Sequence, residues 1–429
     1  MVQSLIFIYT IQIFIINSLH LLTKKFKNDI IKYIKIVKGV REKMSNKCLT
    51  VNELFSGIGT QAFALEYMKI PHKVVGTAEI EKNAIEAYNI AHGETHNYGD
   101  ISKIESLDYA DLWTYSFPCQ DLSSGGKGAG INAIDDDGNK VATRSGLLWE
   151  VERLLAHSCG YDIDKKTNKL IKNEEYEVNP PKYLLLENVA ELVNVKKHKV
   201  NFDRWKERLD ELGYITSIAI LNGKDFGIPQ NRQRVFCLSV RKDVYPDEVY
   251  LPSTAKVHPA KFEDFVDKEV LDYKGGLMID PAISDYLMPA YTRDLEAISK
   301  SDKEIFTCEC KSGFQDHRVG ITAAPTIRHQ NQHTAIFVNN QIHKLTACEC
   351  WKFMGIKEED FWKVKNNSNI SNNIMCGLAG NAIVVPVLMS IFYQIYLIET
   401  RGYPIENPAT VPYLTLKDNV ENLNPALYD

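Results

Sequence analysis

The stretch LTVNELFSGIG, at positions 49–59, decides the fold of this 429-residue chain. An apolar run leads into a turn that contains Gly57 and Gly59, and residues 60–68 then space their apolar side chains as a helix does. This order predicts a strand, a glycine turn and a helix. We therefore expect an α/β fold that starts here.

Strand and helix patterns continue to alternate as far as residue 240. The predicted strands cover residues 74–78, 112–117, 183–186, 216–221 and 235–240. The predicted helices cover residues 82–91, 147–155 and 202–212, and a charged loop is expected at 162–179. Such alternation is typical of a mostly parallel sheet with helices on both faces. We predict a Rossmann-like α/β domain.

The regular alternation stops after Arg241. Residues 243–340 mix Pro, Gly and Asp with short apolar pieces, which predicts a smaller, irregular second domain. Residues 345–354 and 383–400 are helical, and the second of these helices is apolar enough to pack back on the first domain. We expect an N-terminal extension (1–46), a first domain (47–242), an irregular domain (243–343), a return segment that completes the first domain (344–400) and a tail (401–429).

The N-terminal extension differs in composition from the rest. Residues 1–44 carry eight Lys or Arg and two acids, which gives this segment a net charge of +6. Since the whole chain has a net charge of −5, the remainder has −11. The apolar run 5–22 resembles a marginal membrane span or a weak signal peptide. A third interpretation, which we favour, is that translation starts at Met44, because Lys38-Gly39-Val40 can be encoded as a ribosome-binding sequence. An AAG-GGC codon pair at Lys38-Gly39 would refute it.

The nine cysteines are scattered and form no CxxC pair, so we predict no disulfide framework and a cytoplasmic location. Two CxC pairs, at 308–310 and 348–350, are candidate zinc ligands, but the second lies in a helical pattern, and we predict no metal site. An acidic body does not favour nonspecific binding of polyanions. Any nucleic-acid contact should therefore lie in a local cleft, and no membrane partner is expected.

Strand ends in such a sheet line a crevice at its carboxyl edge, where ligands bind, and four candidate groups should meet there. They are the Gly57/Gly59 turn, Glu79, Asp100 and Pro118-Cys119. Glu79 follows Gly59 at the spacing of an acid that binds ribose hydroxyls, but the turn is not GxGxxG. S-adenosylmethionine, a nucleoside without pyrophosphate, suits the turn better than NAD; a plain tight turn stays an alternative. The Cys119 thiol is a candidate nucleophile, and the alternative is an inert buried cysteine.

With its motifs taken together, the chain resembles the DNA (cytosine-5)-methyltransferases of prokaryotes and phages. The motifs run in the family's order and comprise Phe55-Ser56-Gly57-Ile58-Gly59, Phe117-Pro118-Cys119-Gln120, Arg144-Ser145-Gly146-Leu147-Leu148, Glu187-Asn188-Val189, Gln230-Asn231-Arg232-Gln233-Arg234, residues 344–355 and Gly380-Asn381 with Val384. Leu378 and Ala382 depart from the Gln and Ser usual in the family. The resemblance implies a methyltransferase domain that uses S-adenosylmethionine, with residues 243–343 as its target-recognition domain.

The resemblance also implies the roles of single residues. Cys119 would attack C6 of a flipped-out cytosine, Glu187 would contact N3 and the exocyclic amine, and Arg232 and Arg234 would supply positive charge. Residues 121–143 would form a loop that closes on DNA. The implied cofactor contacts are Phe55, Gly57, Ile58, Gly59, Glu79, Ile80, Asp100, Ile101, Pro118 and Asn381. The candidate DNA contacts are Ser123, Gln230, Arg328 and Asn331, with His329 and Gln332 as further readers by residue type.

We expect a monomer that methylates double-stranded DNA and protects it from a restriction endonuclease acting on the same site, without a physical complex between the two. A tRNA cytosine-5 methyltransferase with the same fold is an alternative, but this chain lacks the Cys-Phe-Thr motif of those enzymes. A catalytically silent DNA-binding regulator is a second alternative. A NAD oxidoreductase would leave Cys119 unexplained.

Overall fold

The computed structural model describes residues 48–118, 144–164, 166–252, 261–272, 323–328, 334–338 and 341–405, together with five two- to four-residue strand segments between residues 133 and 320. The chain divides between Cys48 and Leu49 into two units, and the description that follows is of the second unit. The predicted N-terminal extension (1–46) and the predicted translation start at Met44 lie outside the described residues.

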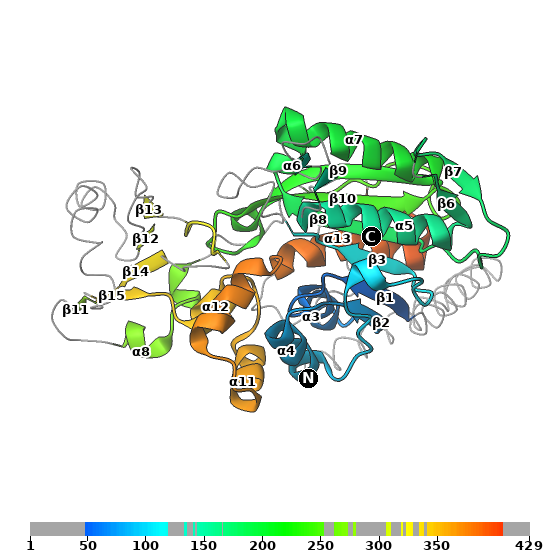
Figure 1. Cartoon of the computed structure of the whole chain (residues 1–429). Coiled ribbons are helices and arrows are strands. Elements are labelled where there is room, and N and C mark those ends of the chain that lie inside the picture. Colours follow the sequence, from blue (N-terminus) through cyan, green and yellow to red (C-terminus); the bar gives the residue numbers. More distant parts are fainter. Residues whose placement is uncertain are drawn as a thin grey trace, which may run out of the picture. The chain divides into compact units, whose positions relative to one another are not determined.

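A six-stranded sheet forms the centre of this unit, in the order β2-β1-β3-β8-β10-β9 (Figure 1). Its strands are β1 (Leu49–Leu54), β2 (His72–Ala78), β3 (Leu112–Tyr115), β8 (Tyr183–Val189), β9 (Tyr214–Asn222) and β10 (Gln233–Arg241). Neighbours from β2 to β8 run parallel, and β10 runs antiparallel to both β8 and β9. The predicted α/β fold with a mostly parallel sheet is therefore confirmed.

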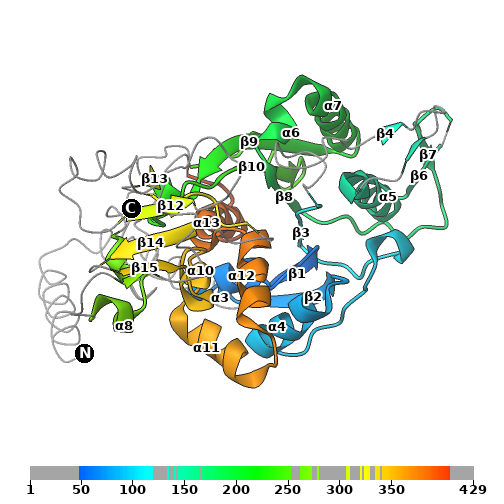
Figure 2. The same ribbon diagram turned by 60° about the vertical axis from the view of Figure 1, so that its left-hand side comes forward.

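Helices cover both faces of this sheet (Figure 2). Strand β8 is apolar on both sides: Leu184 and Leu186 enter one core with α5 (Leu148–Ser158) and α7 (Lys196–Glu211). Tyr183 and Leu185 enter the other core with α3 (Thr60–Tyr67), α4 (Lys82–His92) and α13 (Val385–Arg401). Alternating side chains that are all buried are expected for a parallel strand between two helical layers.

The C-terminal helices pack in the core that contains α3 and α4. Helix α10 (Ala347–Lys352) begins with a capping box between Thr346 and Glu349, and α11 (Glu358–Asn367) packs on α4. Helix α12 (Asn372–Asn381) leads into α13, which packs on α3. Among the described residues, no single helix is long and apolar enough to cross a membrane, whereas α12 and α13, bent by 40°, pass that test only as a pair.

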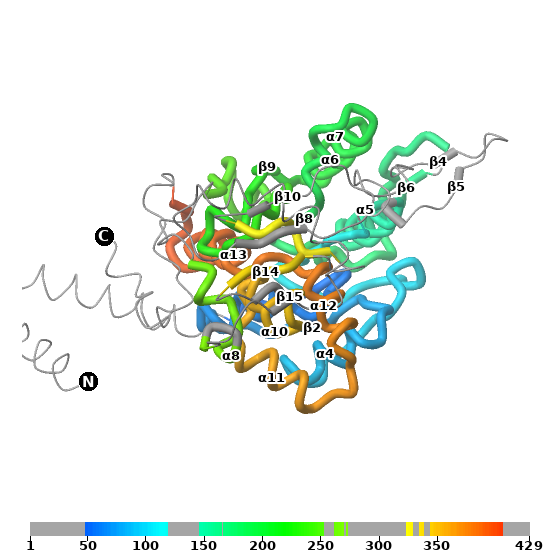
Figure 3. Tube along the Cα trace, turned by 90° about the vertical axis from the view of Figure 1, so that its left-hand side faces the viewer, coloured from blue at the N-terminus to red at the C-terminus, as the bar shows by residue number. Residues whose placement is uncertain are grey.

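A second, smaller sheet lies in the region where the sequence has no regular rhythm (Figure 3). Its order is β11-β15-β14-β12-β13. The strands are β11 (Met278–Ile279), β12 (Phe306–Glu309), β13 (Val319–Gly320), β14 (Thr334–Val338) and β15 (Gln341–Lys344). Strands this short leave no alternation long enough to read in a sequence.

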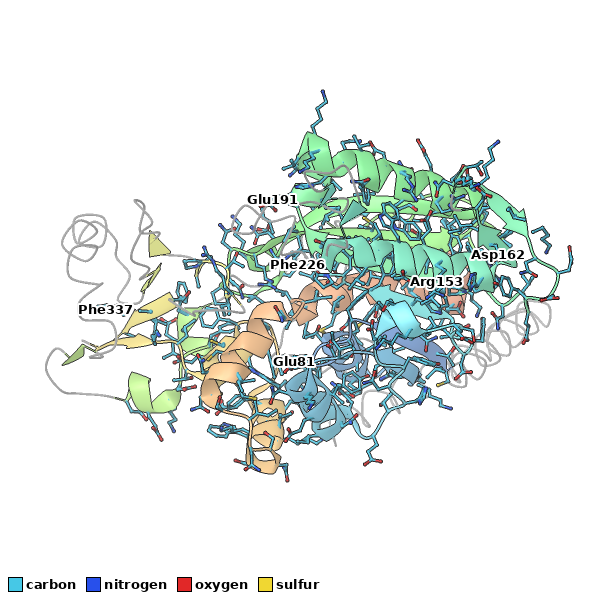
Figure 4. The ribbon with its side chains drawn as sticks, viewed as in Figure 1. Glu81, Arg153, Asp162, Glu191, Phe226 and Phe337 are labelled. Carbon is cyan, nitrogen blue, oxygen red and sulfur yellow. The ribbon has the colours of Figure 1, made fainter. Side chains whose placement is uncertain are left out.

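The loop predicted at 162–179 is wrong in part, because β6 (Tyr161–Ile163) and β7 (Leu170–Lys172) form a hairpin there. Distant contacts hold its tip: Arg204 donates to Asn168 Oδ1 at 2.9 Å, and Arg208 donates to the Asn168 carbonyl at 2.5 Å. Both arginines also bind the buried Glu152 on α5. Figure 4 labels Asp162 in this hairpin.

The remaining described elements are short. They are the 3₁₀ helices η1 (Ile101–Lys103), η2 (Arg144–Leu147), η3 (Gly223–Phe226) and η4 (Phe262–Asp264), the helices α6 (Glu191–Asn194) and α8 (Lys268–Leu271), and the pair β4 (Ala133–Ile134) and β5 (Lys140–Val141).

Candidate active site

A cavity of about 270 Å³ opens at the carboxyl ends of the parallel strands β1, β2, β3 and β8. Most of the predicted cofactor and catalytic residues line it, namely Phe55, Gly57, Ile58, Glu79, Ile80, Asp100, Ile101, Pro118, Glu187, Arg232, Arg234 and Asn381. Leu378 and Ala382, which depart from the family pattern, also line it. The topology thus brings together residues that are more than 300 positions apart in the chain.

The turn after β1 has an unusual backbone. Phe55, Gly57 and Gly59 all have positive φ, at 60°, 56° and 75°. A non-glycine residue in this region costs about 1–2 kcal/mol, so Phe55 is held there by its surroundings, including the bond from its amide to the Ala78 carbonyl at 2.7 Å. Backbone strain of this kind concentrates at functional sites.

The two glycines of the turn have different neighbours. A Cβ on Gly57 would meet nothing within 4 Å, so this backbone is open to a ligand. A Cβ on Gly59 would lie 2.6 Å from His92 Nε2 and from Tyr88 Cε2. Gly59 is absent from the cavity lining, and its role in this structure is close packing under the turn.

Glu79 holds the turn in place from the end of β2. Its Oε2 accepts a hydrogen bond from the Gly57 amide at 2.9 Å, and its Oε1 accepts from the amides of Ile80 and Glu81 at 2.8 and 2.9 Å. A carboxylate oxygen accepts more than one hydrogen bond. Glu79 can therefore fix the turn and still accept from a ligand hydroxyl, while Ile80 is 72% exposed at the rim.

Asp100 lies at the N-terminal end of η1 and accepts from the hydroxyl and the amide of Ser102 at 2.8 and 3.0 Å. These hydrogen bonds hold the pKa of Asp100 below its usual range. Arg153 on α5, labelled in Figure 4, donates to the Ile104 carbonyl at 2.7 Å and so ties η1 to the sheet's helical layer. Asp100 is therefore a fixed anion at the cavity.

Glu187, near the end of β8, is 6% exposed and has two partners. The Ser116 hydroxyl donates to its Oε2 at 2.5 Å, and Arg234 Nε lies 3.3 Å from its Oε1. Ser116 reaches it because β3 and β8 pair in parallel with Tyr115 opposite Leu186. Ser116 was not predicted as a site residue, although neighbouring strands that end together are a signal that could have found it.

The chain just before the predicted nucleophile is also held by β8. The Asn188 side-chain amide donates to the Phe117 carbonyl at 2.9 Å, one residue before Pro118. Both Phe117 and Asn188 are buried. Cys119 itself, Ser123 and most of the predicted closing loop lie outside the described residues.

The two predicted arginines differ in their contacts. Arg232 is 3% exposed and donates to the carbonyls of Ile327, Gly380 and Ala382, each at 2.9 Å. Arg234 contacts Glu187 and the Gln233 carbonyl. Their guanidinium groups therefore serve different parts of the site.

The prediction that Gln230 contacts DNA needs a correction. Gln230 is fully buried, and its amide donates to the Phe353 carbonyl at 2.8 Å and accepts from the Ile327 amide at 3.2 Å. A side chain whose amide is saturated inside the protein cannot read a base in this conformation. Arg328 is half-buried, while His329, Asn331 and Gln332 lie outside the described residues.

The fold has the architecture of methyltransferases of known structure. The chain is similar to the S. pombe Dnmt2 methyltransferase, with a TM-score of 0.53 and 20% identity over 83% of this chain and 100% of that one. It is also similar to a putative DNA modification methyltransferase encoded within an E. coli prophage, with a TM-score of 0.51 and 15% identity over 82% and 98%. At these identities the likeness concerns the fold.

The sequence defines the family. The model of the C-5 cytosine-specific DNA methylases matches residues 49–397. The type II methyltransferase M2.ScrFI of Lactococcus lactis subsp. cremoris is 30% identical over 81% of this chain and 99% of its own length. The orphan methyltransferase M.SssI of Spiroplasma monobiae is 28% identical over 82% and 99%. The chain belongs to the C-5 cytosine-specific DNA methylase family, which confirms the predicted enzyme class.

Proposed function

We propose that this enzyme transfers a methyl group from S-adenosylmethionine to C5 of a cytosine flipped out of a specific double-stranded DNA sequence. Family membership supports the reaction and the substrate class. The name type II methyltransferase, carried by the L. lactis relative, supports a role in restriction–modification. The modified DNA would then resist an endonuclease that acts on the same site.

The observation that carries the proposal is the environment of Glu187. Its carboxylate is buried between Ser116 and Arg234, one residue beyond Leu186, which pairs with Tyr115. It lies in the cavity that the glycine turn and Pro118 also line. A base that enters this cavity meets a fixed acid, and a methyl donor bound at the turn shares the same space. This arrangement suits methyl transfer to a ring.

The chemistry follows from the weakness of cytosine C5 as a nucleophile. The Cys119 thiolate would form a bond to C6, so that C5 gains enamine character. Glu187 would contact N3 and the exocyclic amine, stabilising or protonating the ring as negative charge develops on it. After methylation, C5 loses its proton to water, the C6–S bond breaks and the Cys119 thiolate leaves. Flipping the base costs a few kcal/mol, which contacts between protein and DNA would offset.

The cavity suits S-adenosylmethionine on three counts. The open backbone at Gly57 admits a ligand, and Phe55 and Ile101 give apolar contact. Glu79 at the end of β2 and Asp100 at the start of η1 are fixed carboxylates. When bound, the cofactor supplies an electrophilic methyl group. The protein's part is to bind the adenosine through these groups and to exclude water from the reacting centre.

We further propose the division into domains given by the sequence. Residues 47–242 and 344–400 would form the catalytic domain, and residues 243–343 the target-recognition domain, with Arg328, Asn331 and Ser123 as DNA contacts. The small sheet β11–β15 falls almost wholly within that second range. The enzyme would act as a monomer in the cytoplasm, in no complex with the endonuclease.

Bisulfite sequencing of DNA from cells that express the enzyme, beside a Cys119→Ser control, tests the proposal. We expect protected cytosines at one short sequence for the wild type and none for the variant. Methylation of tRNA alone would favour the RNA methyltransferase. Protection of DNA from cleavage without any 5-methylcytosine would favour the silent regulator.

A further inference from the structure

The segment that precedes β10 is joined to a distant part of the chain. Residues 229–232 run beside residues 324–327, with a parallel bridge between Gln230 and Ala324. The Asn231 amide donates to the Ala324 carbonyl at 2.7 Å, and the Ala324 amide donates to the Pro229 carbonyl at 2.6 Å. The Thr326 hydroxyl adds a bond to the Asn231 carbonyl at 2.7 Å. We name residues 324–328 the recognition segment, because Arg328 at its end is one of the proposed DNA contacts.

Two buried side chains hold Ile327 of this segment by both of its backbone polar atoms. The Ile327 amide donates to Gln230 Oε1 at 3.2 Å, and Arg232 donates to the Ile327 carbonyl at 2.9 Å. Gln230 and Arg232 are 0% and 3% exposed. Water cannot replace these bonds at buried atoms, so the position of Ile327 depends on them.

The same guanidinium reaches the cavity wall. A second nitrogen of Arg232 donates to the Gly380 and Ala382 carbonyls, both at 2.9 Å, and these residues flank Asn381. Asn381 and its two neighbours line the cavity proposed for the cofactor. Two residues further along β10, Arg234 contacts Glu187. Arg232 thus contacts two parts of the protein through one planar guanidinium group. One is the recognition segment, and the other is residues 380–382, which we call the cofactor wall.

We propose that Arg232 is a positioning residue, which couples occupation of the recognition segment by DNA to the shape of the cofactor wall. The guanidinium has donors in a rigid fork, so a shift of Ile327 must be followed by Gly380 and Ala382. Coupling of this kind is reciprocal: target DNA strengthens cofactor binding by the factor by which cofactor strengthens DNA binding. The inference rests on the proposed function, since it takes the cavity as the cofactor site.

The test uses the full chain and S-adenosylhomocysteine, the demethylated product of the cofactor. Its Kd is measured by calorimetry without DNA and with a duplex that carries the site identified by bisulfite sequencing, and the two values give a coupling ratio. For Arg232→Lys we expect the ratio to fall to about one fifth of the wild-type value or lower. Lysine keeps the charge but loses the fork.

Arg241→Lys is the matched control. Arg241 ends β10, the strand that follows Arg232, and donates to the Pro180 carbonyl at 2.7 Å, away from the cavity lining. We expect this variant to keep the wild-type ratio. Because Arg232 is buried, Thr326→Val provides a milder test, since it removes one hydroxyl bond of the same joint; its ratio should fall about twofold without a change in Tm.

Two results would overturn the proposal. One is an unchanged ratio in Arg232→Lys together with slower methyl transfer, which would place Arg232 in the chemistry itself. The other is a ratio of one in a wild-type enzyme that does methylate DNA. A wild type that leaves DNA unmethylated would contradict the proposed function instead, so the two failures are distinguishable.

Discussion

Arg234 and Glu187 form an ion pair across β10 and β8, with Nε 3.3 Å from Oε1, and their side chains are 17% and 7% exposed. A pair this far from solvent is poorly screened, and loss of one partner leaves the other charge buried and unpaired. The pair therefore fixes the position of the acid that the proposed reaction places on the cytosine ring.

Replacing Arg234 by methionine should slow methyl transfer by about 100-fold, because Glu187 then lacks the cation that orients it. Arg234→Lys should recover part of this loss. The measurement is kcat for the transfer of tritiated methyl groups to DNA, with Arg241→Lys as the control. A methionine variant as active as the wild type would show that the pair has no part in the reaction.

Ser116→Ala tests the second partner of Glu187. It removes the hydroxyl that donates to Oε2, and a neutral donor to a charged group is worth about 1.5–3 kcal/mol. We expect kcat to fall about tenfold, since the Arg234 contact remains. Ser116→Thr, which keeps a hydroxyl, should lose less; equal losses in both variants would point to packing rather than to the hydrogen bond.

The two glycines of the turn should respond differently to alanine. Gly59→Ala drives a Cβ against His92 and Tyr88, so we expect a loss of about 2–4 kcal/mol in the free energy of unfolding. Gly57→Ala meets open space and carries only the strain of its positive φ, about 1 kcal/mol. Its main effect should be weaker binding of S-adenosylhomocysteine. Denaturant unfolding and calorimetry separate the two outcomes, and a reversal of the pattern would contradict the assignment of Gly57 to the cavity.

Glu53 gives a prediction for pH. It is fully buried on β1, and burial raises its pKa from an ordinary value of 4.5 to about 7, although the nearby His92 and Tyr88 lower it somewhat. The protonated acid therefore stabilises the folded state by about 3 kcal/mol below pH 4.5; this contribution declines as the pH rises and is lost above about pH 7.

Glu53→Gln should remove that component, so its free energy of unfolding should fall less than that of the wild type between pH 4.5 and 7. Denaturant unfolding at several pH values measures both curves. Parallel curves for the two proteins would refute a raised pKa at Glu53.

The sequence predicted the elements whose signal is local. Neighbouring residues alone predict the turn at Gly57 and Gly59, the alternation up to residue 240 and the apolar helix α13. The β6–β7 hairpin was missed because its tip is held by Arg204 and Arg208 from a helix that follows it in the chain. Long-range contacts of this kind have no local pattern.

The residues of the site also divide into those with a local signal and those whose contacts are long-range. Strand-end positions brought Glu79 and Pro118 to one cavity, whereas Asp100 reaches it from the start of η1. Gln230 and Arg232 were assigned to DNA and to catalysis by resemblance. Gln230 accepts from the Ile327 amide, and Arg232 donates to the carbonyls of Ile327, Gly380 and Ala382, so their burial depends on remote segments that meet only in the folded chain. A motif identifies such residues without revealing what they touch.

The formation of a covalent bond between Cys119 and cytosine C6 is the central claim, and trapping it is the most direct test. The enzyme is incubated with S-adenosylmethionine and a duplex whose target cytosine carries fluorine at C5, which blocks the loss of a proton from that carbon after methylation. We predict a protein–DNA complex that survives denaturing electrophoresis and yields a modified peptide containing Cys119, with none formed by Cys119→Ser. Methylation of ordinary DNA by an enzyme that forms no such complex would contradict the account.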